Sequence, residues 1–196
     1  MQLCLVGGTF DPPHWGHILL AETLYTQIPV EQVMFVPAAI PPHKRHETIS
    51  TAEHRVRMLE LICRQNTHFQ VDSREIERSG ISYSIETVRA VKKEKALERD
   101  DLGFLIGTDN FADLQNWKEA EQLVRACRIL VMPRLHYPFP DEAPFRDQVE
   151  SVDLPIVEIS SSTIRQRVRQ GLSIRYYVLP EIERYIAEHA LYQHRD

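Results

Sequence analysis

The segment LCLVGGTFDPPHWGHILLAETLYTQI, residues 3–28, indicates the fold class at the start of the chain. Residues 3–6 form a short apolar run that predicts a buried strand. Residues 17–28 place apolar side chains at three- and four-residue spacing, which predicts a helix. Between them, residues 7–17 contain two glycines and two prolines, which are typical of a sharply turning, fixed loop. The segment therefore predicts a strand–loop–helix unit.

The same alternation continues along the chain. Further strands are expected at 32–36, 69–71, 102–106 and 128–132, and further helices at 51–65, 83–98 and 117–126. Alternating strands and helices favour right-handed crossovers and a parallel sheet. We therefore predict one α/β domain over residues 1–196, a doubly wound, Rossmann-like parallel sheet with helices on both faces.

The C-terminal third departs from this rhythm. Residues 134–155 contain four prolines and show no clear period, which predicts an irregular connection. We expect a final short strand at 155–160, then helices at 161–170 and 179–192. Residues 158–196 would thus form a C-terminal helical part of the domain.

Composition limits the classes of protein. The net charge of −5 argues against broad nucleic-acid binding. No apolar run is long enough to cross a bilayer and the N-terminus lacks the features of a secretory signal, so the expectation is a cytoplasmic protein without a membrane partner. The three cysteines are isolated in apolar contexts and are expected to be buried free thiols. The oligomeric state is open, a homo-oligomer included.

The loop at 7–17 has the features of a phosphate site. Gly7 and Gly8 allow the backbone to approach a ligand, and the following helix N-terminus attracts anions. His14 and His17 could face one pocket and donate hydrogen bonds to phosphoryl oxygens. Two alternatives remain open: the histidines could be surface residues of a turn, or metal ligands. No third ligand accompanies them at suitable spacing, and no metal site is predicted.

Two later motifs suit the same chemistry. In ISSSTIR (159–165), serines can cap a helix, and Arg165 has a planar donor fork suited to phosphate. The alternative is an ordinary capped helix with a surface arginine. In IGTDN (106–110), Asp109 follows a buried strand and could accept hydrogen bonds from ribose hydroxyls, or could cap a helix. A basic loop at 40–46 presents His43, Lys44, Arg45 and His46, which could contact phosphates. The alternative is a basic loop exposed to solvent without a ligand.

GGTFDPPHWGH resembles the G-x-F-x-P-x-H-x-G-H signature of nucleotidyltransferases that transfer AMP or CMP onto a phosphate group, and ISSSTIR resembles their I-S-S-x-x-I-R motif. From about residue 3 to residue 192, the chain is similar to the bacterial nicotinate-nucleotide adenylyltransferases. This resemblance implies transfer of AMP from ATP to nicotinate mononucleotide, giving nicotinate adenine dinucleotide and pyrophosphate in NAD biosynthesis. Mg²⁺ would accompany ATP, and no covalent enzyme intermediate is expected.

The resemblance also implies roles for individual residues. The implied catalytic residues are His14, His17, Lys44 and Arg165. The implied ATP-binding residues are Gly7, Gly8, Thr9, Phe10, His14, His17, Gly107, Asp109, Ser160, Ser161, Ser162, Ile164 and Arg165. The implied residues for the pyridine nucleotide are Lys44, Ser84, Thr87, Trp117, Lys118 and Arg134.

Within the last group, Trp117 would stack on the pyridine ring, and backbone N–H groups near Ser84 and Lys118 would meet the nicotinate carboxylate. The chain departs from the family pattern in three places. Ser84 and Ser162 stand where threonine is common, and a glycine beside Arg134 is absent.

Other functions fit parts of the pattern. A pantetheine-phosphate adenylyltransferase or a cytidylyltransferase would share the first motif and the fold, although the former usually has threonine at the position of His14. A nucleotide-binding module without catalysis would need only the fold and some phosphate contacts. Pyrophosphate release from ATP with different acceptors would separate these functions.

Overall fold

The computed structural model describes residues 1–40, 50–140 and 142–193. Its centre is a six-stranded sheet with the order β3-β2-β1-β4-β5-β6, in which every neighbouring pair is parallel. This order is the doubly wound arrangement, in which the chain reverses direction across the sheet beside its first strand. The predicted α/β, Rossmann-like fold is confirmed.

The elements follow in chain order and alternate as the sequence predicts in the first two thirds. The strands are β1 (Leu3–Gly8), β2 (Gln32–Pro37), β3 (Phe69–Val71), β4 (Leu102–Gly107), β5 (Arg128–Met132) and β6 (Val149–Ser151). The α-helices are α1 (Trp15–Gln27), α2 (Ala52–Cys63), α3 (Arg74–Arg78), α4 (Ser84–Lys95), α5 (Thr108–Asp113), α6 (Ala120–Ala126), α7 (Ser161–Arg169) and α8 (Pro180–Glu188). Short 3₁₀ turns are η1 (Arg99–Asp101), η2 (Leu114–Asn116) and η3 (Arg146–Gln148).

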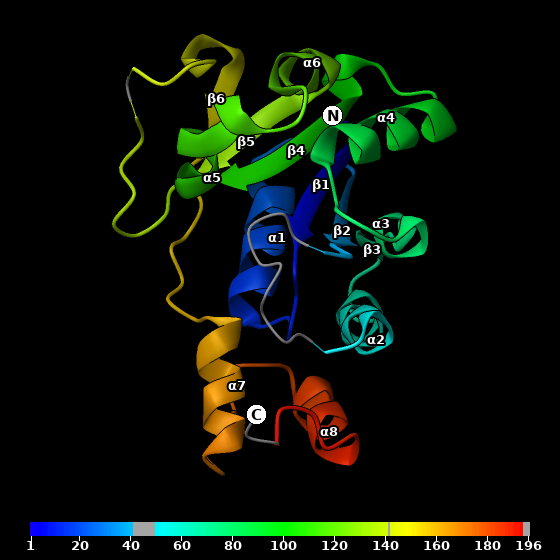
Figure 1. Ribbon diagram of the computed structural model, residues 1–196, viewed down its shortest axis with the longest axis vertical. Coiled ribbons are helices and arrows are strands. Elements are labelled where there is room, and N and C mark those ends of the chain that lie inside the picture. Colours follow the sequence, from blue (N-terminus) through cyan, green and yellow to red (C-terminus); the bar gives the residue numbers. More distant parts are fainter. Residues whose placement is uncertain (41–49, 141, 194–196) are drawn as a thin grey trace.

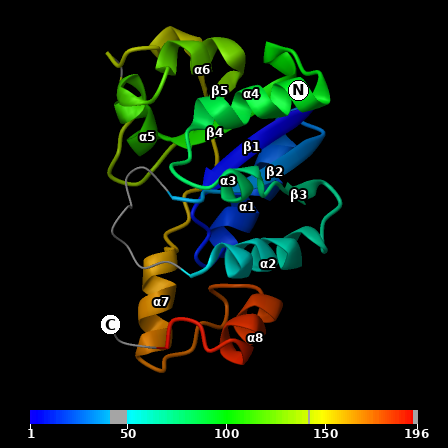
Figure 2. The ribbon, with the colours of Figure 1, turned by 45° about the vertical axis from the view of Figure 1, so that its right-hand side comes forward.

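Helices cover both faces of the sheet (Figures 1 and 2). On one face, α1 and α2 pack against the sheet, and the C-terminal helices α7 and α8 add to the same apolar cluster through Ile164, Ile182 and Ile186. On the other face, α4, α5 and α6 enclose a second cluster that includes Ile85, Phe111 and Leu123. The four central strands β1, β2, β4 and β5 are therefore largely buried on both sides, which explains their nearly continuous apolar runs in the sequence.

The prediction for residues 134–160 was partly wrong. The last strand is β6, which lies inside the segment predicted to be irregular and pairs with β5. Residues 155–160, predicted as a strand, have no regular structure and carry the chain from the sheet to α7. Pro155 disfavours a strand at 155–160, because proline cannot donate a hydrogen bond to a neighbouring strand. β6 is an edge strand in which only Val149 is buried, so its sequence lacks the apolar pattern that predicts a strand.

Helix boundaries also needed correction near residue 117. The predicted helix at 117–126 begins only at Ala120, and Trp117 is the capping residue that follows η2. The short helices α3 and α5 were not predicted. Cys4 and Cys127 are buried, Cys63 is partly buried, and all three are free thiols. Within the described ranges, no helix has the length and apolar character needed to span a membrane.

Candidate active site

The predicted nucleotide residues lie where the sheet topology brings two strand ends together. β1 is flanked by β2 on one side and by β4 on the other. The chain first adds β2 and β3 on one side of β1, and then adds β4, β5 and β6 on the other side. The carboxyl end of β1 leads into residues 9–14, and that of β4 leads directly into α5. Open parallel sheets bind ligands in the crevice at such a switch point.

The two histidines of the first loop lie against each other. His14 stands immediately before α1, and its backbone N–H donates to Nδ1 of His17 over 3.2 Å. The ring centroids are 3.8 Å apart, and the ring of Phe10 meets His17 edge-on at 4.9 Å. Since Nδ1 of His17 accepts this hydrogen bond, a neutral His17 carries its proton on Nε2. That nitrogen is then a hydrogen-bond donor.

Both imidazoles are held in the neutral form in the free protein. Burial lowers the pKa of His14 to about 4, and the positive charge of Arg134 adds to this shift. Burial also lowers the pKa of His17 well below its ordinary value, with further contributions from His14 and Arg134. At neutral pH the pair therefore offers N–H donors without a net charge.

Two glycines are required by the space around the site. A Cβ on Gly16 would lie 3.0 Å from Nδ1 of His14, and one on Gly107 would lie 2.9 Å from Cγ and Nε of Arg134 and closer still to Asp109. A larger residue at either position would push these side chains away from their observed places. Glycine here keeps the wall of the site in place.

Asp109 and Arg134 form the wall beside β4 and β5. Oδ1 of Asp109 is buried, makes no hydrogen bond within the described part of the chain, and lies 3.9 Å from Nε of Arg134. Thr108 holds the chain that carries Arg134, since its hydroxyl accepts from the Arg134 N–H at 3.0 Å and donates to the Tyr137 carbonyl at 2.7 Å. Oδ1 of Asp109 therefore has spare acceptor capacity.

The N-terminus of α7 is attached to the first loop. Ser160 caps the helix, accepting the N–H of Thr163 at 3.1 Å. The Ser161 hydroxyl donates to the Pro12 carbonyl at 2.8 Å, and Nη1 of Arg165 donates to the Asp11 carbonyl at 2.7 Å. The two motifs, about 140 residues apart in sequence, therefore meet directly.

Two buried charged residues support the loop and were not predicted. Nη1 of Arg55 donates to the carbonyls of Thr9 and Ala38, at 3.0 and 2.7 Å, and thereby ties the loop to the chain that follows β2. Asp11 is fully buried. A signal for Arg55 was present, because it shares the apolar face of α2 with Met58, Leu59 and Ile62 at helical spacing. The sequence carries no comparable signal for Asp11.

The residues predicted to meet the pyridine ring lie on the α4 and α6 side. Trp117 is partly buried, meets Phe104 edge-on at 6.4 Å, and its Nε1 is buried without a hydrogen bond to any described residue. Lys118 is exposed, and its Nζ pairs with Glu86 at 2.5 Å and lies over the Tyr83 ring. Ser84 is the first residue of α4. This end is more open than the histidine loop.

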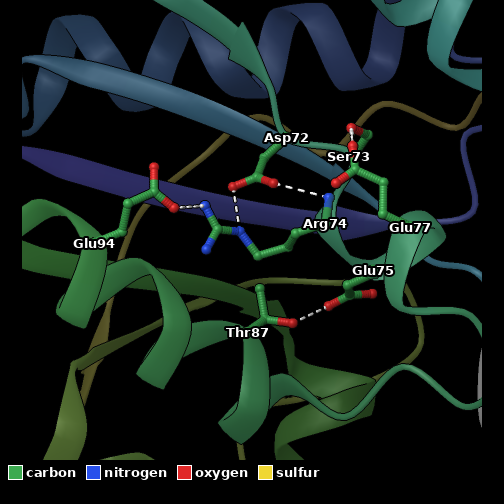
Figure 3. A network of polar contacts seen from close by, with 7 residues as sticks. All are labelled: Asp72, Ser73, Arg74, Glu75, Glu77, Thr87 and Glu94. Carbon is green, nitrogen blue, oxygen red and sulfur yellow. Dashed lines mark hydrogen bonds and ion pairs between the residues drawn. The ribbon is translucent and has the colours of Figure 1, made fainter.

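Thr87 lies one turn further along α4 and is fully buried. Its hydroxyl donates to Glu75 of α3 at 2.5 Å (Figure 3). In the same network, Arg74 joins Asp72 to Glu94 through ion pairs of 2.6 and 2.9 Å. Thr87 therefore connects α4 to α3 through a buried side chain, and its role in the substrate pocket stays a prediction.

The remaining predicted ATP-binding and catalytic residues differ in where they lie. The side chains of Phe10 and Ile164 belong to the apolar core, so neither side chain faces the crevice, although the Phe10 ring supports His17. Lys44 lies outside the described residues, together with His43, Arg45 and His46. Gly7 and Gly8, predicted in the loop after the first strand, are the last two residues of β1 and pair with β2, and Thr9 follows them. Ser162 lies exposed in the first turn of α7.

The donor set does not form a cage for a metal ion. No group of three or more histidine, cysteine, aspartate or glutamate side chains comes together for this purpose among residues 1–40, 50–140 and 142–193. Asp109 is the acidic residue of the crevice wall, and the Asp11 carboxylate is occupied by Ser50 and Tyr192. Mg²⁺ prefers several oxygen ligands, which these residues do not supply.

Comparison with known proteins agrees with this geometry. The cytidylyltransferase-like family model matches residues 5–167. A protein of Exiguobacterium sibiricum described as "Probable nicotinate-nucleotide adenylyltransferase" is 38% identical over 194 residues, covering 98% of this chain and 99% of that protein. A Thermus thermophilus protein with the same description is 38% identical over 193 residues, covering 98% and 100%.

A solved structure shares the fold. The Plasmodium falciparum nicotinic acid mononucleotide adenylyltransferase, complexed with NaAD, superposes with a TM-score of 0.81 at 18% identity, covering 99% of this chain and 98% of that one. The full-length likeness to the bacterial relatives and the meeting of both signature motifs at one crevice lead to the same assignment. The chain belongs to the nicotinate-nucleotide adenylyltransferase family, within the cytidylyltransferase-like enzymes.

Proposed function

We propose that this enzyme transfers AMP from ATP to nicotinate mononucleotide, yielding nicotinate adenine dinucleotide and pyrophosphate. The observation that carries the proposal is the joining of the His14–His17 loop to the N-terminus of α7 through Ser161 and Arg165. This junction places two imidazoles, a helix N-terminus and a guanidinium along one side of the crevice. Such donors suit a triphosphate.

The reaction would be a direct in-line displacement. A phosphate oxygen of nicotinate mononucleotide attacks the α-phosphorus of ATP, a new P–O bond forms, and the bond to the β-phosphate oxygen breaks. Pyrophosphate leaves with the electron pair. Because the nucleophile is already an anion, no general base is needed, and catalysis depends on positioning and on stabilising charge on the transferring phosphoryl group.

The roles of individual residues follow from their chemistry. Nε2–H of His17 and the ring of His14 would donate to oxygens of the transferring group, and Arg165 would hold the β- and γ-phosphates. Asp109 would accept from ribose hydroxyls, using the spare capacity of its buried oxygen. Lys44 is proposed as a further cation for the phosphates, by resemblance alone.

At the open end, Trp117 would stack on the pyridine ring. The first N–H groups of α4, from Ser84 onward, and that of Lys118 would meet the nicotinate carboxylate, with Arg134 near the mononucleotide phosphate. Since the described residues offer no oxygen cage, we propose that Mg²⁺ arrives with ATP, and that the substrate is the magnesium complex.

The test is pyrophosphate release from ATP and Mg²⁺, with nicotinate mononucleotide, nicotinamide mononucleotide and phosphopantetheine offered separately at equal concentration. Strong preference for the nicotinate form is expected, because an amide lacks the charge that the backbone N–H groups would pair with. Activity with phosphopantetheine alone would keep the chemistry and overturn the pyridine pocket. ATP binding without pyrophosphate release in any mixture would point to a binding module.

A further inference from the structure

A buried polar cluster beneath the phosphate loop joins three distant parts of the chain. Its centre is Asp11, whose carboxylate accepts the Ser50 N–H at 3.1 Å, the Ser50 hydroxyl, and the Tyr192 hydroxyl at 2.6 Å. Tyr192 lies 181 residues further along the chain, beyond α8. These contacts are separate from the hydrogen bonds within the helices and the sheet, and they add to the backbone hydrogen bond from Trp15 to Tyr177, which also joins the loop region to the C-terminal part.

The charges of the cluster are balanced. Asp11 is fully buried, and an unpaired carboxylate there would be strongly unfavourable. Its negative charge acts on Arg55, which is itself buried under the loop. Burial, followed by the charge of Asp11, raises the pKa of Tyr192, so the phenol stays protonated and serves as a donor. Asp11 thus has a nearby cation in Arg55 and a hydrogen-bond donor in the Tyr192 hydroxyl.

The cluster is directly connected to the site. The carbonyl of Asp11 accepts Nη1 of Arg165, and the carbonyl of the next residue, Pro12, accepts the Ser161 hydroxyl. Asp11 therefore holds the C-terminal segment with its side chain and the phosphate motif of α7 with its backbone. A movement of the Asp11 side chain would displace the carbonyl that orients Arg165.

We propose that Asp11 and Tyr192 are positioning residues of the triphosphate site: Tyr192 fixes the Asp11 carboxylate, and Asp11 fixes Arg165 and the loop that carries His14 and His17. Neither residue contacts ATP. The C-terminal segment is then part of the working site as well as of the folded core. This inference rests on the proposed function, because it assigns the positioned groups to ATP.

The first test is Tyr192→Phe in the full chain, which removes one hydroxyl and keeps the ring packed against the core. We expect the Kd for ATP, measured by titration calorimetry without the second substrate, to rise about 10-fold, the scale of a hydrogen bond to a charged acceptor. Asp11→Asn should have a larger effect, because the amide NH₂ cannot accept the Ser50 N–H and the carboxylate charge is lost. The KM for the mononucleotide should stay within about twofold of wild type.

The matched control is Tyr185→Phe on α8. Its hydroxyl is also hydrogen-bonded, to Nδ1 of His54 at 2.9 Å, but it lies between α2 and α8, away from the loop. This variant should lower the Tm comparably and leave the Kd for ATP unchanged. If both variants lower the Tm equally and neither changes the Kd for ATP, the inference is overturned, and Tyr192 has a purely structural role.

A double-mutant cycle tests the route. If Tyr192 acts through Asp11 and Arg165, the effect of Tyr192→Phe on ATP affinity should largely disappear in an Arg165→Ala background. Full additivity would overturn the route. Wild-type protein that binds ATP but releases no pyrophosphate with any acceptor would overturn the proposed function, while the affinity comparison would still decide the inference.

Discussion

The two ends of the crevice are built in different ways. At the proposed phosphate end, burial keeps His14 and His17 neutral, and their loop is held by hydrogen bonds from Arg55, Ser161 and Arg165. At the proposed mononucleotide end, Trp117 is partly buried and Lys118 is exposed, with its ammonium group already paired to Glu86. Preorganised groups cost nothing to reorient during a reaction, whereas exposed ones contribute mainly to binding. The phosphate end is therefore expected to govern kcat and the other end KM.

The largest expected effect tests the phosphate end. His17→Ala should lower kcat by about 10²–10³, the typical consequence of losing a preorganised donor to a developing charge, with little change in KM for the mononucleotide. Steady-state kinetics with pyrophosphate detection would measure it. His17→Asn, which keeps a donor, should recover part of the rate. Normal turnover in His17→Ala would contradict the expectation that the phosphate end governs kcat.

The next effect tests the mononucleotide end. Trp117→Ala should raise the KM for nicotinate mononucleotide about tenfold by removing a stacking surface, and should change the KM for ATP little. Trp117→Phe should lie between this variant and wild type. Because Trp117 also packs on Phe104, circular dichroism must first show that both variants are folded. A fall in kcat without a change in KM would contradict the assignment of Trp117 to the mononucleotide end.

A pH experiment sharpens the description of the phosphate end. The folded pKa of His14, about 4, lies below its unfolded value near 6.5, so protonation favours unfolding. Stability from this group is complete above pH 6.5 and is lost progressively as the pH falls toward 4. His14→Asn should therefore show a weaker fall in Tm between pH 6.5 and 4.5 than wild type. His136 is exposed, and His136→Asn serves as the control. Parallel curves of Tm against pH for His14→Asn and wild type would argue against a buried neutral histidine at position 14.

The smallest effect concerns Lys118. Lys118→Ala should change KM for the mononucleotide less than about twofold, because its side chain is exposed and ion-paired, and only its backbone N–H is assigned to the substrate. Kinetics at two salt concentrations would check this. A tenfold or larger loss would mean that the ammonium leaves Glu86 and meets the ligand, and the contrast between the two ends would weaken.

The sequence predicted what local patterns determine. Five strands and the two motifs were located correctly because buried parallel strands and glycine- or serine-rich turns have strong local signals. β6 was missed because an edge strand with one buried residue has almost no pattern, and the apolar 155–160 segment imitated a strand. The Asp11 cluster could not be predicted, since its partners Ser50 and Tyr192 come from distant positions.

The parallel strand order has a consequence for synthesis of the protein. β1, made first, pairs with β4, which begins about 100 residues later, and the phosphate loop receives its last hydrogen bond from Tyr192. A ribosome-bound chain therefore displays both histidines long before it has the groups that hold them. Under the proposed role of Tyr192, ATP should stabilise a chain made only as far as α7 less than one that also contains Tyr192.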